Sequence, residues 1–456
     1  MERSETPSAL LVDLYELTMA AGYFEHRVNC RATFELFVRH LPPSRAYLVA
    51  AGIEAALDYL ENLHFTDDDI RFLRSQPVFQ SVSSSFFDYL KAFRFGGDVM
   101  AVPEGSLIFA EEPILQVTAP ILEAQIVETY LLSVINFETL IASKAARVVR
   151  AAAGRAVLEF GTRRAHGPEA GVRAARAAYV GGCAATSNVE AGRRYNIPLA
   201  GTAAHSWTQI FPSERESFEA LTQTFPENAI LLIDTYDSLM GARTAVSLGR
   251  KIAGVRLDSG NLLEKSRQVR KILDQGGLQS TIIVASGDLN EEKIESLVRE
   301  GAPIDAFGVG TELATSKDFP ALGVVYKLVE TEQNGRREYQ TKLSEEKVYS
   351  PGKKQIFRFP RLGPYAYDVL ARATENFPEG TPLLQPAMRE GRRLTAPAPT
   401  AELRTRTLRE LDRLPVAYHA LHNAPRYPVR KSPALERLLE QVREEHLQPS
   451  APSASP

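Results

Sequence analysis

The sequence is poor in cysteine and lacks any long apolar run. Only two of its 456 residues are cysteine, Cys30 and Cys183, which are too few for a disulfide framework or a cysteine-ligated metal site. The first residues hold no basic segment followed by an apolar stretch, and no later segment stays apolar for the width of a bilayer. We therefore expect a protein of the reducing cytoplasm with no transmembrane helix.

An excess of charge of one sign is also missing, because 53 basic residues stand against 56 acidic ones. The net charge of −3 gives no long-range attraction to nucleic acid or to a membrane surface. Apolar residues make up 44% of the chain, which is enough to bury a large core. At this length we expect two or three domains.

The first part of the chain predicts a small α+β domain. Residues 8–24 have the apolar spacing of a helix, residues 32–38 alternate like a strand, and residues 65–93 have a helical pattern. Two more strand-like runs lie between residues 97 and 118 and are separated by turn residues. Together these segments favour one sheet with helices packed against it.

A long helix is predicted at residues 122–152, and after it the pattern changes to a regular alternation of strand and helix. Six short apolar runs alternate with helix-like segments, at residues 156–160, 197–200, 230–233, 252–257, 281–285 and 304–307. Such alternation predicts a parallel sheet whose faces are covered by helices. Its repetition over about 170 residues predicts an α/β fold with an irregular βα barrel.

Beyond the barrel, the sequence predicts a return to the first domain and then a cap. Asn334-Gly335 lies between two strand-like runs and is a strong signal for a two-residue hairpin. We predict a discontinuous α+β N-terminal domain, the barrel, a C-terminal helical cap and a disordered tail, at residues 1–121 with 325–360, 122–324, 361–447 and 448–456. The helices of the cap are expected at residues 401–413 and 432–445.

Polar residues and glycines follow the predicted barrel strands. In chain order they are Arg163, Arg164, His205, Asp234, Asp237, Arg256, Asp258, Ser259, Ser286, Asp288, Gly308, Gly310 and Thr311. In a βα barrel these positions share one rim, at the carboxyl ends of the strands, where such folds carry their chemistry. One such residue alone is often only a helix cap, but six strand ends of this kind favour a functional site.

The rim residues offer two kinds of chemistry. Guanidinium groups clamp carboxylates or phosphates, and carboxylates hold divalent cations through oxygen. The turn 308–311 can direct backbone N–H groups at a phosphate. A sugar pyrophosphate bound with Mg²⁺ would use all of these groups, so an anionic substrate of this class is expected.

The combination of motifs resembles nicotinate phosphoribosyltransferases. The motifs are Asp13-Leu14-Tyr15, Glu159-Phe160-Gly161-Thr162-Arg163-Arg164, Gly181-Gly182 with Thr186-Ser187-Asn188, Gly201-Thr202-Ala203-Ala204-His205-Ser206, Asp234-Thr235-Tyr236-Asp237, Val255-Arg256-Leu257-Asp258-Ser259-Gly260, Ala285-Ser286-Gly287-Asp288 and Phe307-Gly308-Val309-Gly310-Thr311. The resemblance implies that nicotinate is joined to phosphoribosyl pyrophosphate, with hydrolysis of ATP and with Mg²⁺, in a homodimer with shared active sites. The products are nicotinate mononucleotide and pyrophosphate, which begins NAD synthesis from nicotinic acid.

The resemblance also implies a role for each motif residue. Arg163 would hold the nicotinate carboxylate or a phosphate, with Ser187 on the loop that faces the base. Phe160 would cover one face of the pyridine ring, and Tyr15 of the other subunit would cover the second face. The remaining assignments are Arg256, Asp258 and Ser259 for the ribose and pyrophosphate with Mg²⁺, Asp288 for the ribose hydroxyls, Gly308, Gly310 and Thr311 for the 5′-phosphate, and His205 as the residue that ATP phosphorylates.

Three positions depart from the pattern of that family. Asn261 stands where the family commonly has Asp, Cys183 lies in a run that replaces Phe-Asp-Gly, and His166 replaces Gln.

Three other functions stay open. The alternatives are transfer to nicotinamide, transfer to quinolinate with decarboxylation, and a non-catalytic barrel that binds a phosphorylated metabolite. Amide-using relatives carry an Asp at the position of Ser187, so Ser187 favours an acid as the substrate.

Overall fold

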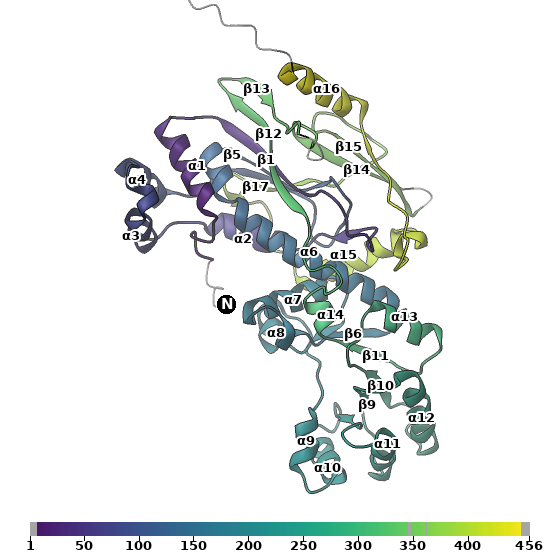
Figure 1. Cartoon of the computed structure of the whole chain (residues 1–456). Helices are drawn as coiled ribbons and strands as arrows, with labels where there is room; N and C mark the ends of the chain where they lie inside the picture. Colours follow the sequence, from purple (N-terminus) through teal and green to yellow (C-terminus); the bar gives the residue numbers. More distant parts are fainter. Residues whose placement is uncertain (1–6, 345–347, 361–362, 448–456) are drawn as a thin grey trace, which may run out of the picture.

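The computed structural model describes residues 7–344, 348–360 and 363–447. Figure 1 shows two main sheets separated by a long central helix, α6 (Glu128–Ala151). The helix predicted at 122–152 is broken at Val127, so that a short helix, α5 (Ile121–Ile126), precedes α6. The predicted disordered tail, residues 448–456, lies outside the described residues.

The first sheet has seven strands drawn from both ends of the chain. In spatial order they are β13 (Arg336–Tyr339), β12 (Val324–Gln333), β1 (Arg31–Val38), β5 (Pro113–Pro120), β3 (Asp98–Ala101), β17 (Gln385–Arg389) and β18 (Arg392–Arg393). β1 pairs antiparallel with β5 on one side and with β12 on the other. The hairpin between β12 and β13 is confirmed, and its residues Asn334 and Gly335 have φ of 52° and 76°, as a type I′ turn requires.

Helices cover this sheet and share its core. They are α1 (Leu14–Glu25), α2 (Ile53–Asn62), α3 (Asp67–Ser75) and α4 (Ser84–Ala92). α1 begins later than the predicted start at residue 8, because Asp13 has an extended backbone at the N-cap. Buried side chains from residues far apart in sequence, such as Leu36, Leu131 and Met388, belong to one apolar core.

The second sheet is the predicted barrel, and all of its strands are parallel. In spatial order they are β7 (Ala185–Thr186), β6 (Ala156–Glu159), β11 (Ala306–Val309), β10 (Ile282–Ala285), β9 (Gly254–Leu257) and β8 (Ile230–Leu232). The last strand pairs with the first, as in a barrel, but within the described residues no ladder joins β7 to β8. The run predicted as a strand at 197–200 makes only one bridge, between Leu199 and Thr186. Pro198 interrupts that run and has no N–H to extend a ladder.

Helices connect the barrel strands. They are α7 (Pro168–Val180), α8 (Val189–Tyr195), α9 (His205–Ile210), α10 (Glu214–Thr224), α11 (Ser238–Ser247), α12 (Leu262–Gln275), α13 (Glu291–Arg299) and α14 (Thr311–Ala314). Val157, Val255, Ile283 and Phe307 are almost fully buried at the centre of the sheet. These apolar positions fix the strands, and hence the residues that follow them, at one rim.

The C-terminal region contains more strand than the predicted helical cap. Its helices α15 (Thr400–Arg413) and α16 (Pro433–Leu447) agree with the prediction. Between and before them lie β17, β18 and a second small sheet of β16 (Thr381–Pro382), β14 (Lys354–Pro360), β15 (Tyr365–Arg372) and β19 (Val429–Lys431), while β2 (Leu48–Val49) pairs with β4 (Leu107–Ile108). The prediction of a C-terminal helical cap did not include the strands β15 to β19.

No helix in the described part of the chain is long and apolar enough to cross a membrane.

Candidate active site

A cavity of about 610 Å³ opens at the carboxyl ends of the barrel strands. Ten of the residues predicted for the site line it, namely Phe160, Arg163, Ser187, His205, Arg256, Asp258, Asp288, Gly308, Gly310 and Thr311. Segments that follow β6, β7, β9, β10 and β11 contribute, together with Leu232 at the end of β8, so these strand ends share one concave surface. Thr202, Ser286, Leu289 and Glu312 also line the cavity and were given no role from the sequence.

The centre of the cavity is a network around Arg256, which lies on β9. Its Nη2 donates to Oδ1 of Asp258 at 2.7 Å, its Nε to Oγ of Ser286 at 2.7 Å, and its Nη1 to Oγ1 of Thr202 at 2.6 Å. Each nitrogen of the guanidinium therefore has a fixed partner. Because the group has five N–H donors, it keeps donors for a bound anion.

Asp258 is ionised at this centre despite partial burial. Burial alone would raise the pKa of its carboxyl, but the Ser286 hydroxyl and the Arg256 guanidinium hold the pKa below its usual value. The ionised form is the one that can stabilise a developing positive charge or accept a cation. A positive and a negative group thus stand side by side in the cavity.

His205 is the first residue of α9 and faces the same network. Its Nδ1 lies 3.2 Å from Oγ1 of Thr235, and its Nε2 lies 3.9 Å from Oδ2 of Asp258. The side chain is 42% exposed, so the imidazole is reachable from the cavity. One ring nitrogen is held by the protein and the other points toward the charged centre.

Asp234, which follows the neighbouring strand β8, supports the loop after β9. Its Oδ2 accepts the backbone N–H of Asp258 at 2.9 Å and the hydroxyl of Ser259 at 2.8 Å. Its Oδ1 is buried and has no hydrogen-bond partner within the described residues. Ser259 is turned toward Asp234 and does not line the cavity, unlike its predicted neighbours. The sequence placed Asp234 at the rim but did not reveal that it holds the Asp258 loop.

Two glycines allow the cavity walls to approach one another closely. A Cβ on Gly308 would lie 2.5 Å from the ring of Phe160, so this aromatic ring packs directly on the backbone of β11. A Cβ on Gly287 would lie 2.0 Å from the carbonyl oxygen of Asp258, and Gly287 has a φ of 94°. The guanidinium of Arg256 lies 5.9 Å from the centre of the Phe160 ring. The ring is therefore held beside the charged centre.

Tyr15 is the one predicted residue that lies in the other half of the molecule. It belongs to α1, which packs on the N-terminal sheet, away from the barrel strands (Figure 1). Its side chain is not among those that line the cavity and is 44% exposed. Burial of its hydroxyl and the nearby Glu128 raise its pKa, so the phenol stays neutral.

The departures from the expected motifs have local structural explanations. Asn261 caps α12, because its side-chain oxygen accepts the N–H of Glu264 at 3.2 Å. Cys183 is fully buried, and burial raises the pKa of its thiol, so it is unreactive. Its carbonyl accepts a 2.8 Å hydrogen bond from Arg404 of α15, which ties the C-terminal region to this loop. His166 is exposed and lies outside the cavity lining.

Among the described residues, no group of three or more His, Cys, Asp or Glu side chains is placed to hold a metal ion. The carboxylates at the cavity are Asp258, Asp288 and Glu312, each after a different strand. Such separated carboxylates suit a cation that is brought by a phosphorylated substrate and keeps several water ligands.

Comparison with known proteins gives a consistent result along the chain. Residues 10–136 match the N-terminal domain of nicotinate phosphoribosyltransferase, residues 156–338 match the nicotinate phosphoribosyltransferase family, and residues 372–439 match its C-terminal domain. A nicotinate phosphoribosyltransferase of Mycobacterium tuberculosis is 45% identical over 92% of this chain and 91% of that protein. One of Bacillus subtilis is 44% identical over 77% of this chain and 73% of that protein. The crystal structure of human nicotinic acid phosphoribosyltransferase has a TM-score of 0.82 at 30% identity, covering 94% of this chain and 99% of that one.

Proposed function

The chain belongs to the nicotinate phosphoribosyltransferase family, and from this premise we propose that its rim cavity joins nicotinate to phosphoribosyl pyrophosphate. The pyridine nitrogen forms a bond to C1′ of the ribose while the bond from C1′ to the pyrophosphate oxygen breaks. The products are nicotinate mononucleotide and pyrophosphate, and ATP is consumed to ADP and phosphate. This is the entry of nicotinic acid into NAD synthesis.

Nicotinate is bound between Phe160 and the loop that carries Ser187. The exposed guanidinium of Arg163 at the cavity wall binds the carboxylate of the base through a planar pair of N–H donors. Ser187 leaves room for that carboxylate and, being neutral, does not repel it. The ring of Phe160 packs on one face of the pyridine.

The phosphoribosyl group lies across the ends of β9, β10 and β11. The free donors of Arg256 bind the pyrophosphate, and Asp258 faces the ribose carbon on which positive charge develops as the pyrophosphate leaves. Asp288 accepts from the ribose hydroxyls, and the backbone of Gly308, Gly310 and Thr311 holds the 5′-phosphate. Ser259 supports this site through Asp234.

Two cavity carboxylates would hold a magnesium ion that accompanies the pyrophosphate. Asp258 and Asp288 would hold it, because both are cavity carboxylates and Mg²⁺ in such sites takes one or two carboxylates together with substrate phosphates. When bound, it would neutralise the leaving pyrophosphate. Arg256 then fixes the orientation of the pyrophosphate and keeps Asp258 ionised.

ATP acts on His205. If Nδ1 donates its proton to Thr235, the lone pair of Nε2 is free to attack the γ-phosphorus of ATP. The new N–P bond replaces the bond to ADP, and water later cleaves the phosphohistidine to release phosphate. Because Nε2 is 3.9 Å from Asp258, phosphorylation places negative charge beside the carboxylate that serves the ribose. This proximity links ATP use to the transfer site.

The active enzyme is a homodimer in which each site takes Tyr15 from the other subunit. A pyridine ring on Phe160 leaves its second face exposed to water, and a tyrosine ring would cover it. Tyr15 is half exposed on α1 and is absent from the lining of its own cavity.

We further propose a cytoplasmic location, which accords with free Cys30 and Cys183.

The observation that carries this function is the convergence of Arg256, Asp258 and His205 in the cavity that Phe160 and Arg163 line. The test is pyrophosphate release from phosphoribosyl pyrophosphate with nicotinate, nicotinamide and quinolinate in parallel. We expect release with nicotinate and a stimulation by ATP. Preference for either of the other bases would overturn the substrate assignment, and no release with any base would overturn the reaction.

A further inference from the structure

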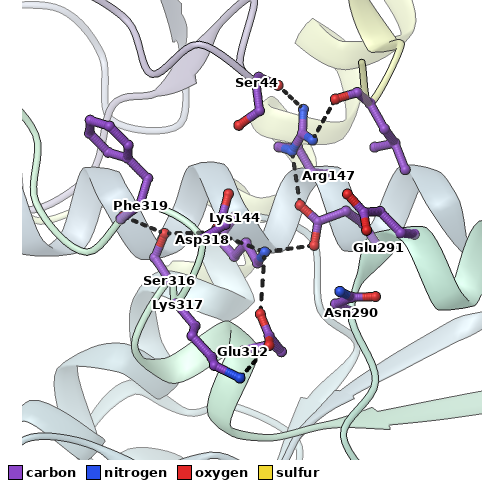
Figure 2. Close-up of polar contacts among 12 residues, drawn as sticks. Ser44, Lys144, Arg147, Asn290, Glu291, Glu312, Ser316, Lys317, Asp318 and Phe319 are labelled. Carbon is purple, nitrogen blue, oxygen red and sulfur yellow. Dashed lines mark hydrogen bonds and ion pairs between the residues drawn. The ribbon is translucent and has the colours of Figure 1, made fainter.

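The buried side chain of Lys144 contacts α13 and α14, the helices that follow the barrel strands β10 and β11 (Figure 2). Lys144 belongs to α6, and its side chain is 1% exposed. Its Nζ lies 2.7 Å from Oε2 of Glu291, the first residue of α13, and 3.9 Å from Oε2 of Glu312 on α14. It also lies 2.9 Å from Oδ1 of Asp318. One ammonium group thus joins carboxylates from three segments.

Two of these segments continue directly from loops of the cavity. Asp288 precedes Glu291 by three residues, and Thr311 immediately precedes Glu312. Asp288, Thr311 and Glu312 all line the cavity. The contacts of Lys144 therefore fix the loop after β10 relative to the loop after β11, from behind the cavity wall.

Other cations complete the cluster around Lys144. The pairs are Arg147 with Glu291 at 3.1 Å, Lys317 with Glu312 at 3.2 Å and Arg45 with Asp318 at 3.2 Å. Four cations face three carboxylates, so the cluster has one positive charge in excess. Burial alone would raise the pKa of Glu291, but Lys144 and then Arg147 hold it below its usual value. Arg45 and Lys144 likewise lower the pKa of Asp318 against the effect of its partial burial.

Glu312 gives this cluster a direct electrostatic link to the substrate. Its side chain is 17% exposed and lines the cavity next to the turn 308–311. A carboxylate at that position repels a phosphate unless its charge is balanced. Lys144 and Lys317 neutralise the charge of Glu312, and neither lysine lines the cavity.

We propose that Lys144 is a positioning residue for the phosphoribosyl end of the active site, which it serves by fixing the loops after β10 and β11 and by neutralising Glu312. This inference rests on the proposed function, because it assigns the turn 308–311 to the 5′-phosphate. Lys144 does not touch the substrate. Its loss weakens the binding of phosphoribosyl pyrophosphate and leaves the binding of nicotinate, at the other end of the cavity, nearly unchanged.

The test is direct binding of phosphoribosyl pyrophosphate to the Lys144→Met variant. Isothermal titration calorimetry measures this binding without turnover. We expect the Kd of phosphoribosyl pyrophosphate to rise at least about tenfold, as loss of one nearby compensating charge predicts. The KM of nicotinate should change by less than about twofold. The second substitution Glu312→Gln should recover most of the lost affinity, since it removes the unbalanced carboxylate.

Lys354→Met is the matched control. Lys354 is also a buried lysine, 4% exposed, and its Nζ lies 2.7 Å from Oε2 of Glu35 in the N-terminal half. Its removal costs stability without touching the cavity. An unchanged Kd in Lys144→Met overturns the proposal. So does an equal loss for both substrates, or an equal loss in Lys354→Met, because either result means general destabilisation.

If Lys144→Met does not fold, the single variant Glu312→Gln tests the proposal through its Kd for phosphoribosyl pyrophosphate. Tighter binding of phosphoribosyl pyrophosphate supports the proposal, and unchanged or weaker binding contradicts it. The titration contains no nicotinate, so it is independent of the transfer reaction. A wild-type protein that fails to bind phosphoribosyl pyrophosphate would overturn the proposed function itself. Normal wild-type binding with no effect of these substitutions would overturn only the role of Lys144.

Discussion

Arg256 and Asp258, two residues apart at the end of β9, are joined side by side by a 2.7 Å ion pair that faces the cavity. Arg256 lies on the strand and Asp258 directly follows its last residue, and both side chains line the cavity. Ser286 contacts both side chains from the next loop and fixes their orientation. Under the proposed function, this one short segment supplies a binding group for the leaving pyrophosphate and a carboxylate that faces the ribose carbon.

Arg163→Lys should raise the KM of nicotinate by about tenfold, with a smaller effect on the KM of phosphoribosyl pyrophosphate. Lysine keeps the charge but loses the planar pair of donors that fits a carboxylate. Initial rates at varied concentrations of each substrate measure both constants. An unchanged KM for nicotinate would mean that Arg163 serves another group, and Arg164→Lys is the neighbouring control because Arg164 also lines the cavity.

Ser187→Asp should shift the preference from nicotinate toward nicotinamide. The new carboxylate repels the acid and accepts a hydrogen bond from the amide N–H. The ratio of kcat/KM for the two bases is the quantity to compare between variant and wild type. An equal loss for both bases would show that the loop after β7 does not face the pyridine ring.

Glu16→Gln should stabilise the protein at pH 9 but not at pH 5. Burial raises the pKa of Glu16 from 4.5 to about 8, against the opposing hydrogen bonds from Thr129, and its Oε2 lacks a hydrogen-bond partner in the described residues. A raised folded-state pKa contributes stability that is complete below pH 4.5 and is lost as the pH rises through 8. Thermal unfolding of both proteins at the two pH values checks this sign. An equal difference in Tm at both pH values would contradict it.

Complementation between inactive subunits tests which subunit supplies Tyr15 to each active site. Tyr15→Ala and Arg256→Ala chains should each be nearly inactive, because each damages every site of its own homodimer. Mixed dimers would have one site with neither substitution. Since they make up about half of a random mixture, activity should return to about a quarter of wild type. No recovery after proven subunit exchange would place Tyr15 outside a shared site.

Much of this structure follows from local sequence patterns. The apolar runs at 230–233 and 281–285 become β8 and β10, and the polar residues after the barrel strands meet at one rim because parallel strands point the same way. The hairpin at Asn334-Gly335 is equally local, since both residues adopt the positive φ that its turn requires. In these segments the short-range signal and the final fold agree.

The remaining features depend on partners that are distant in the sequence. β17 was not predicted, because residues 385–389 join the first sheet by pairing with β3, nearly three hundred residues earlier. Lys144 lies in the middle of a helix, where a lysine is normally exposed, and its role depends on carboxylates beyond residue 290. The support of the Asp258 loop by Asp234 is likewise a contact between the segments that follow two neighbouring strands. Such contacts exist only once the chain has folded.

The most direct test of the account is the ATP dependence of nicotinate mononucleotide formation in wild type and in His205→Ala. In wild type, ATP should increase the rate, and γ-labelled ATP should leave an acid-labile, base-stable phosphate on the protein. In the variant, the ATP-independent rate should persist, because Arg256 and Asp258 are intact, while both the stimulation and the label disappear. A variant that is still stimulated by ATP or still labelled would contradict the assignment of this cavity as the site where ATP hydrolysis is coupled to transfer.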